Sequence, residues 1–312
     1  MSVNDSTGNL VWPTYQSYTL FNYAIQCVEA VLIIVGNGLT FIAVIKVKNL
    51  KQIPTNVFIM SLATSDGIIG LLLPVLVGVK FLDTEHVWKG TTCLLHGPYF
   101  SLFLTSLVTL LAIAVDRYLA VVHPLTCKQR MTIRRARIIS VVIWILSFGI
   151  LTTITCYYGL QRNVVLLRSR VVFFVFPKNI AIIFLQILII GPVLGNIVIY
   201  ILIYIELKTK RRVGTTRGNN AGANHTVTSK SSKAYVNMMA LVLAYLALAC
   251  VPYYVIAAVL KQGTSTPSWL VYLFDVSVIL FYSNSFVNPL IYSWKNRNFR
   301  EAYKKLMTCR SY

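Results

Sequence analysis

Charged residues are scarce in this sequence. Only 12% of the 312 residues are Asp, Glu, Lys or Arg, which is about half the share found in soluble domains. Hydrophobic residues make up 56% of the chain, and the mean hydropathy is +0.68. This composition excludes an ordinary soluble domain and indicates a protein that crosses a membrane several times.

Acidic residues, histidines and paired cysteines are also few. The chain has 9 acidic residues against 29 basic ones, 4 histidines, and 6 cysteines that lack the close spacing of zinc or redox motifs. The scattered histidines supply neither a metal cluster nor a base beside a nucleophile, so we expect no enzyme. The net charge of +20 does not indicate nucleic-acid binding, because the cations lie in short connections between apolar runs.

Seven apolar runs are long enough to cross a bilayer as helices, which takes about 20 residues each. The sequence predicts an all-α, seven-transmembrane helix bundle with spans at 21–47, 54–81, 91–122, 137–158, 179–207, 236–260 and 269–294. An extracellular segment, 1–20, precedes the bundle at 21–294. A short amphipathic helix on the membrane surface and a cytoplasmic tail follow at 295–312.

Lysine and arginine are distributed unequally between the two ends of the predicted bundle. They are concentrated in the connections after spans one, three and five and in the tail. Because cytoplasmic segments are enriched in these residues, we expect the N-terminus outside, the C-terminus inside and a plasma-membrane location. The Gly-, Asn-, Thr- and Ser-rich stretch 214–232 is expected to be a disordered inner loop.

Three residues are candidates for covalent modification. Asn4 begins an N-glycosylation sequon, which is usable only if the N-terminus is outside. Cys93 precedes span three on the predicted outer side, where it could form a disulfide. Cys309 ends the surface helix, where a palmitoyl group would strengthen contact with membrane lipid; an unmodified cysteine is the alternative.

Asp66 lies in the middle of the predicted second span. A central acid costs about 2.5–3.5 kcal/mol on insertion scales, so it usually has a function. Ser106, Asn284 and Asn288 supply further oxygen atoms at a similar depth, and a hard cation prefers oxygen ligands. We expect a structural sodium ion at these four residues and no other cofactor, whereas a protonated, hydrogen-bonded acid is the alternative.

Several motifs along the chain carry a family resemblance. They are Gly36-Asn37, Ser61-Leu62-Ala63 with Asp66, Trp88 before Cys93, Asp116-Arg117-Tyr118 with Pro124-Leu125, Trp144, Pro192 with Tyr200, Pro252, Asn288-Pro289-Leu290-Ile291-Tyr292 and Phe299-Arg300. With these motifs on the corresponding spans, the chain resembles the rhodopsin-like (class A) G-protein-coupled receptors over nearly its whole length.

The resemblance implies a mechanism and partners. An outside ligand would shift a two-state equilibrium, span six would swing outward at its inner end, and Arg117 would leave Asp116 to face a heterotrimeric G-protein. Arrestin is a further partner that the resemblance implies. The coupling residues would be Asp116, Arg117, Tyr118, Pro124 and Leu125, and the switch residues Pro192, Tyr200, Pro252, Asn288, Pro289 and Tyr292. A snorkelling cation is the structural alternative for Arg117.

The chain departs from the family pattern in three places. The second outer loop has no cysteine, so Cys156 at the end of span four is the candidate partner of Cys93. The aromatic residues usual in span six are replaced by Leu246 and Cys250. Residues 229–242 contain no acid to hold Arg117, and we therefore expect signalling without ligand.

The resemblance excludes some ligands more firmly than it assigns one. Tyr99 replaces the acid of amine receptors, Tyr282 the lysine of opsins, and Ala257 the asparagine of adenosine receptors, while the acids of melanocortin receptors are not found. The remaining pocket candidates are His96, Tyr99, Tyr253, Tyr254, Asp275 and Tyr282. A small molecule, a lipid-like mediator or a short peptide all remain open as ligands.

Two other functions compete with a signalling receptor. A transporter or channel would be expected to have internal repeats and paired acids along a path, and we find no repeat. A receptor-like protein that modulates partners without signalling is the third alternative. The Asp116-Arg117-Tyr118 motif disfavours it, whereas the missing aromatic residues of span six favour it.

Overall fold

The structure is a computed structural model that describes residues 3–4, 10–11, 13–79, 92–123, 127–161, 190–216, 240–256, 259 and 267–308. In these residues, six helices are long and apolar enough to cross a membrane, and the apolar helix Ala240–Ile256 lies at the predicted sixth span. The predicted class, an all-α seven-transmembrane bundle followed by a short helix, is thus confirmed.

The helices follow one another as expected from hydropathy. Their bounds are α1 Pro13–Lys46, α2 Lys48–Lys51, α3 Pro54–Val79, η1 Thr92–His96, α5 Gly97–Val122, α6 Cys127–Arg130, α7 Ile133–Gln161, α10 Gly191–Thr216, α12 Ser268–Lys295 and α13 Arg297–Met307. Before α1, the two-residue strands β1 (Val3–Asn4) and β2 (Leu10–Val11) pair in antiparallel fashion, which hydropathy did not predict.

Two helices extend beyond the apolar runs that predicted them. The helix α1 begins at Pro13, inside the segment expected to precede the bundle, although its membrane-spanning part begins at Leu20. The helix α10 continues to Thr216, so the loop expected from Gly214 does not begin there. Lys and Arg are good helix formers, which explains why α10 continues after its apolar residues end.

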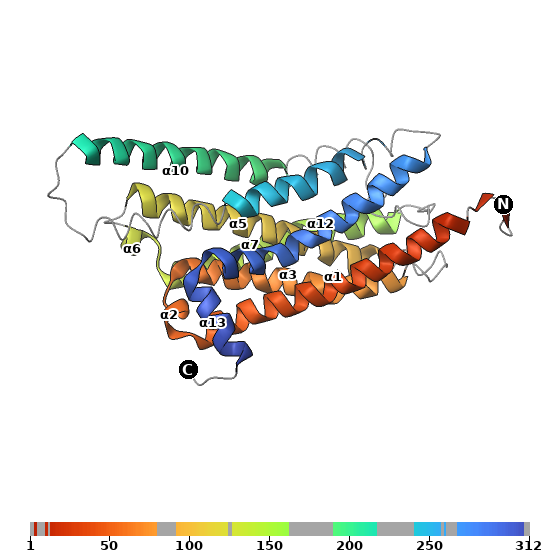
Figure 1. Ribbon diagram of the computed structural model, residues 1–312, viewed down its shortest axis with the longest axis horizontal. Helices are drawn as coiled ribbons and strands as arrows, with labels where there is room; N and C mark the ends of the chain where they lie inside the picture. The colour runs from red at the N-terminus through yellow and green to blue at the C-terminus, as the bar shows by residue number, and fades with distance from the viewer. Residues whose placement is uncertain are drawn as a thin grey trace.

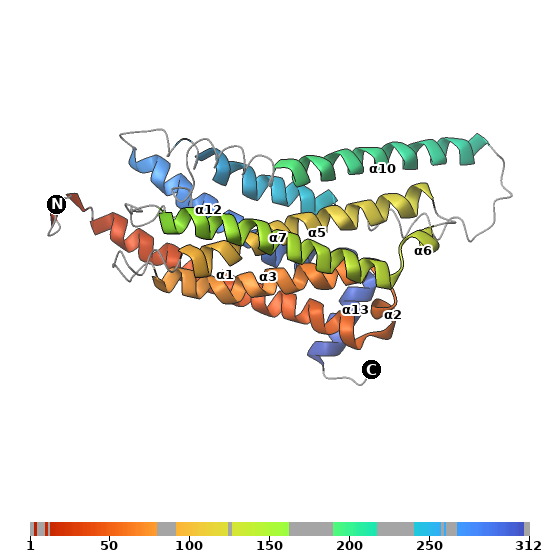
Figure 2. The ribbon, with the colours of Figure 1, turned by 180° about the vertical axis from the view of Figure 1, so that it is seen from behind.

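The helices form a bundle in which α5 is central (Figure 1). It packs against α3, α7 and α10, while α1 packs against α3 and α12. The helix Ala240–Ile256 is the unlabelled light-blue ribbon beside α10 in Figure 1, and the reverse view in Figure 2 brings α7 to the front. The helix α13 crosses the end of the bundle opposite the start of α1 and contacts α1 and α12.

Polar side chains join several of the spans. The indole Nε1 of Trp144 on α7 donates to Ser61 Oγ on α3 at 3.0 Å, and the hydroxyls of Ser101 on α5 and Thr152 on α7 lie 2.9 Å apart. Because the membrane interior offers no water, such groups find partners on neighbouring helices. These bonds fix the relative positions of α3, α5 and α7.

Prolines and a glycine shape the spans. A π-helical turn, η1, stands immediately before α5, whose Pro98 lacks the N–H group that a regular helical turn would use. Pro289 lies inside α12, next to α1. A Cβ atom added at Gly36 on α1 would lie 3.2 Å from Pro289 Cγ, so the two helices approach closely at this glycine.

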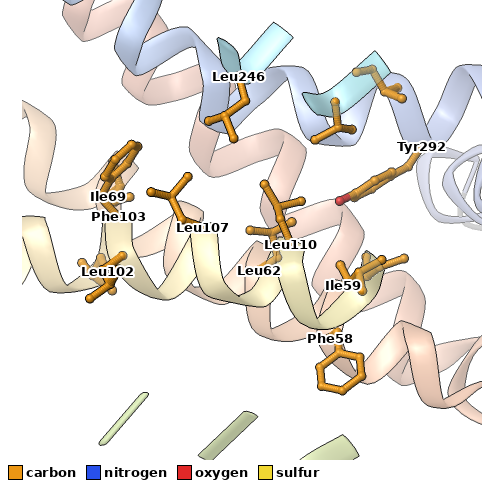
Figure 3. Close-up of a cluster of buried hydrophobic side chains, with 14 of the residues drawn as sticks. Phe58, Ile59, Leu62, Ile69, Leu102, Phe103, Leu107, Leu110, Leu246 and Tyr292 are labelled. Atoms are coloured by element: carbon orange, nitrogen blue, oxygen red, sulfur yellow. The ribbon is translucent and has the colours of Figure 1, made fainter. Parts of the chain in front are cut away.

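The apolar core lies between α3, α5, α12 and the helix Ala240–Ile256. Leu107 and Leu110 of α5, Leu246 of span six and Tyr292 of α12 are all buried in one cluster. Figure 3 shows Tyr292 extending from α12 toward this apolar layer. Asp116 and Arg117 stand farther along α5 than Leu107 and Leu110, toward its C-terminal end.

Candidate functional site

The C-terminal end of α5 holds an ion pair between neighbouring residues. Arg117 Nη2 donates to Asp116 Oδ2 at 2.6 Å, and Arg117 Nε donates to the same oxygen at 3.1 Å. Asp116 is buried, whereas the Arg117 side chain retains some exposure. A charge-assisted contact of this kind is stronger than a neutral hydrogen bond, so it holds the guanidinium against α5.

Thr55 of α3 completes this arrangement. Its hydroxyl lies 2.5 Å from Asp116 Oδ2 and also accepts a hydrogen bond from Arg117 Nη2. The sequence analysis missed Thr55, which stands 61 positions before Asp116; its place in the first turn of an apolar span was the only signal. Tyr118 is half-buried on α5, and the predicted coupling residues Pro124 and Leu125 lie outside the described residues.

The predicted switch residues occupy three helices. Pro192 is the second residue of α10, just after the described part of the chain resumes at residue 190, and Pro252 lies within Ala240–Ile256. Tyr200 of α10 is half-buried against the core. Tyr292 is 1% exposed, and its hydroxyl has no hydrogen-bond partner among the described residues. Such an unsatisfied buried hydroxyl is costly and can gain a partner when helices move.

Asp66 is surrounded by hydrogen-bond donors from two other helices. Ser106 Oγ on α5 donates to Asp66 Oδ1 at 2.9 Å, and on α12 Ser285 Oγ donates to Oδ1 at 3.2 Å while Asn288 Nδ2 donates to Oδ2 at 2.9 Å. The structure thus brings together three of the four predicted sodium ligands. Asn284 differs: in the described contacts, Ser285 reaches the carboxylate and Asn284 does not.

The polar groups around Asp66 fit a small hard cation. The carboxylate and hydroxyl oxygens are donors of the type that such cations prefer. Asn284 Oδ1 is buried and lacks a hydrogen-bond partner among the described residues, so one more oxygen is available nearby on α12. If a cation bound, Ser106 and Ser285 would offer oxygen lone pairs to it, and Asp66 would supply the balancing charge.

Four of the predicted pocket residues meet in an aromatic cluster. Phe281 of α12, which the sequence analysis missed, lies at its centre. Its ring centroid is 4.5 Å from Tyr253, 6.1 Å from Tyr254 and 6.0 Å from Tyr282. Tyr99 contacts Tyr282 edge-to-face at 5.8 Å. Aromatic pairs with such geometry add about 0.5–1.5 kcal/mol each beyond area burial.

The other two pocket candidates lie next to this cluster in sequence. His96 is buried at the end of η1, three residues before Tyr99, and Asp275 is half-buried on α12. Asp275 directly follows Phe274, whose ring stacks on Tyr253 at 5.6 Å.

Phe281 of span seven packs beside α5, whereas span six lacks the aromatic residues usual in the family. Cys250 and Leu246 are both buried, and the ring of Phe281 lies 4.6 Å from Phe103 on α5. An aromatic residue of span seven therefore occupies space beside α5. Span six is joined to span seven by a hydrogen bond between the hydroxyls of Tyr245 and Ser283.

The predicted modification sites are described only in part. Cys156 is disulfide-bonded, and η1, which contains Cys93, packs against α7; the Cys93 side chain lies outside the described residues, so the pairing stays a prediction. Asn4 is in strand β1, but its side chain is likewise not described. Cys309 also lies outside the described residues.

The family of the chain follows from comparison with known proteins. The family model for the 7 transmembrane receptor (rhodopsin family) matches residues 36–292. The chain belongs to this family. It is therefore a class A G-protein-coupled receptor and a multi-pass membrane protein, whose family members are signalling receptors rather than enzymes.

The receptor has relatives with different named ligands. It is 30% identical to the Bos taurus adenosine receptor A2b, with 91% of this chain and 89% of the relative covered. It is 26% identical to the Mus musculus somatostatin receptor type 2, over 94% and 78% of the two chains. It is 27% identical to the Drosophila melanogaster tachykinin-like peptides receptor 86C, over 88% and 56%.

Proposed function

We propose that this receptor binds an extracellular ligand and activates a heterotrimeric G-protein through outward movement of span six at its inner end. The main support for the proposal is the ion pair between Arg117 and Asp116. It holds the guanidinium group at the end of α5 beside an acid that can release it. The positive-inside distribution of lysine and arginine supports a cytoplasmic location for this end and a plasma-membrane receptor with its N-terminus outside.

The resting arrangement is held by contacts among three helices. Thr55 of α3 and Asp116 of α5 hold Arg117, and the Tyr245–Ser283 bond holds span six against α12. Activation breaks both sets of contacts. Arg117 then faces the G-protein, and the unpartnered hydroxyl of Tyr292 and the phenol of Tyr200 are placed to approach it. Pro124 and Leu125 belong to the same coupling surface, which arrestin also uses.

The ligand reaches the aromatic cluster from the other end of the bundle. Tyr99, Tyr253, Tyr254 and Tyr282 provide apolar walls with polar tips, which is typical of ligand sites. His96 and Asp275 contribute at the edge of the site. Ala257 stands where the adenosine-receptor pattern has an asparagine, so the relatives' adenosine is not carried over. A small molecule, a lipid-like mediator and a short peptide all suit these walls.

Sodium at Asp66, Ser106, Asn284 and Asn288 would favour the resting state, because it binds between α3, α5 and α12. A ligand can shift the equilibrium only by its difference in affinity for the two states. Ligand and sodium therefore oppose each other through Phe281 and the residues that follow it on α12.

The proposal is tested by reconstituting the purified receptor with heterotrimeric G-proteins and measuring nucleotide exchange, first without ligand and then with ligand pools. We expect exchange above that of G-protein alone, and loss of it in Arg117→Ala. Arg135→Ala is the matched control, since Arg135 is also basic and at the inner end. In the described residues its side chain hydrogen-bonds only to the backbone carbonyls of Gln129 and Arg130.

Other outcomes would distinguish the rival functions. A ligand-driven current or uptake that survives Arg117→Ala would identify a transporter or channel. Ligand binding without exchange on any G-protein would identify a modulator that does not signal.

A further inference from the structure

A stripe of buried polar side chains runs along the outer part of α1. Asn22, Gln26 and Glu29 stand at i, i+4 and i+7, so they share one face of the helix. Each is at most 5% exposed. The opposite face carries Phe21, Val28 and Val31, which are exposed apolar side chains suited to lipid. Polar residues thus replace the apolar ones expected on the packed face of a membrane helix.

One polar atom of each side chain has no hydrogen-bond partner in the part of the chain that the structure describes. Glu29 Oε2, Gln26 Oε1 and Asn22 Nδ2 are buried and have no hydrogen-bond partner among the described residues. The ion pairs in the described part of the chain involve Asp116 and Glu301, not Glu29. A buried carboxylate is costly unless a cation pairs with it. Gln26 Oε1 and Glu29 Oε2 are therefore two acceptors available to a cation with several N–H donors, whereas Asn22 Nδ2 is a donor.

The stripe borders the aromatic cluster. Ala30 and Ile33, which follow Glu29 on the same helix face, pack with Leu73 of α3 and with Tyr282 of α12. Tyr282 in turn contacts Tyr99 edge-to-face. An ammonium group near Glu29 would also be attracted to the face of an aromatic ring such as that of Tyr282.

We propose that Gln26 and Glu29 bind the ammonium group of a ligand whose apolar part contacts Tyr282 and Tyr99. The inference rests on the proposed receptor function and names the chemical class of its ligand. In the amine receptors of the family the acid is on span three, at the position of Tyr99; here it would come from α1. Glu29 Oε2 and Gln26 Oε1 accept from the ammonium, and the Asn22 amide, whose unpartnered Nδ2 is a donor, borders the site.

The test uses the purified full-length receptor in detergent and two matched pairs of probes. The first pair is 2-phenylethylamine and 2-phenylethanol, which differ in the ammonium group. The second is phenylalanyl-glycine amide and its N-acetyl form, which differ in the peptide amino terminus. We expect the charged member of at least one pair to raise the melting temperature, because a ligand that binds only the folded state stabilises it, and the neutral member not to.

Variants then assign the site. Glu29→Gln keeps the size of the side chain and should weaken the binding of the stabilising probe roughly tenfold or more, since hydrogen bonds to charged groups are strong. Gln26→Leu should weaken the binding of this probe less than Glu29→Gln does. Glu206→Gln, the same substitution near the inner end of α10, is the control and should leave probe binding unchanged. The melting temperature of each variant without probe reports whether it folds.

The outcomes separate the sources and the failures. Stabilisation by phenylethylamine alone would assign a small amine, and stabilisation by the dipeptide alone would assign a peptide amino terminus. The proposal is overturned if charged and neutral probes act alike on the wild-type receptor, if neither acts, or if Asp275→Asn abolishes the effect while Glu29→Gln does not. None of these results depends on a G-protein, whereas nucleotide exchange by the wild-type receptor needs no probe, so the two failures are distinguishable.

Discussion

The hydroxyl of Tyr245 donates its proton to the hydroxyl of Ser283. The direction follows from Ser283 itself, whose single proton is donated to the carbonyl oxygen of Leu280 at 2.6 Å, so that only its lone pairs remain for Tyr245. The helix Ala240–Ile256 is thereby tied to α12 one residue before Asn284. This bond joins the helix expected to move with the helix that carries the sodium-site residues.

Removing this bond should favour the active state. Tyr245→Phe keeps the ring but loses the hydroxyl, and a neutral hydrogen bond contributes about 1 kcal/mol, which corresponds to roughly a fivefold shift in an equilibrium. We expect ligand-independent nucleotide exchange to rise by about this factor. Tyr204→Phe, on an exposed side chain of α10, is the control. Unchanged exchange in Tyr245→Phe at equal receptor amount would contradict the role of this bond.

A second prediction concerns the contact of Thr55 with the ion pair. Thr55→Val preserves the shape and removes the hydroxyl that reaches Asp116 and Arg117. The arginine is then held less firmly, and ligand-free exchange should rise roughly tenfold or more, because hydrogen bonds to charged groups are worth about 1.5–3 kcal/mol. Thr64→Val on the same helix is matched, since its hydroxyl bonds to the Met60 carbonyl of its own helix. Equal behaviour of the two variants would show that Thr55 does not restrain Arg117.

Sodium should stabilise the receptor and oppose its activity. We expect a higher melting temperature and lower ligand-free exchange in sodium chloride than in choline chloride at equal ionic strength. Asp66→Asn should remove both differences. Asn284→Ala and Ser285→Ala then decide which of the two neighbours is a ligand: the variant of a true ligand needs more sodium for the same stabilisation. A response to sodium that persists in Asp66→Asn would place the ion elsewhere.

The attachment of α13 to the bundle depends on a hydrogen bond to α1. The Thr40 hydroxyl donates to the Gly36 carbonyl, so the phenol of Tyr303 donates to Thr40, at 2.6 Å. Burial raises the pKa of Tyr303 to about 12, so the phenol keeps this proton throughout the physiological range.

Tyr303→Phe should loosen this helix. Amide hydrogen exchange in Arg297–Met307 should become severalfold faster, because the lost bond is worth about 1 kcal/mol. Arg297→Gln is the control. It removes an exposed contact with Glu301 that lowers the pKa of Glu301 through a hydrogen bond, and exposed pairs contribute little. Equally fast exchange in both variants would show that Thr40 does not hold α13.

Sequence alone predicted the features that depend on composition and on neighbouring residues. The spans follow from the length of the apolar runs. Asp116 and Arg117 are adjacent, so their pairing could be predicted without knowing the fold. Thr55 and Phe281 could not be predicted, because their roles depend on how α3 and α12 face α5. Ser285, the neighbour of the predicted ligand Asn284, hydrogen-bonds to Asp66, and sequence could not single it out because a difference of one residue turns a helical side chain by about 100°.

Other misses have different physical causes. The end of α10 was misplaced because hydropathy reports where a helix leaves lipid and not where its hydrogen bonds stop. The stripe on α1 did leave a signal: Asn22, Gln26 and Glu29 have helical spacing within an apolar run. Which face of α1 is packed became known only from the fold.

The contact between Gly36 and Pro289 makes the first helix part of any rearrangement of the seventh. A single methyl group at Gly36 would already press on the proline ring. The helices α1 and α12 are therefore packed tightly against each other at this glycine. If α12 moves toward α1 at its proline, it must push α1 sideways into the surrounding lipid. The packing of acyl chains against the lipid-facing side of α1 therefore resists or assists the transition. The bilayer thus contributes to the equilibrium between the resting and active states.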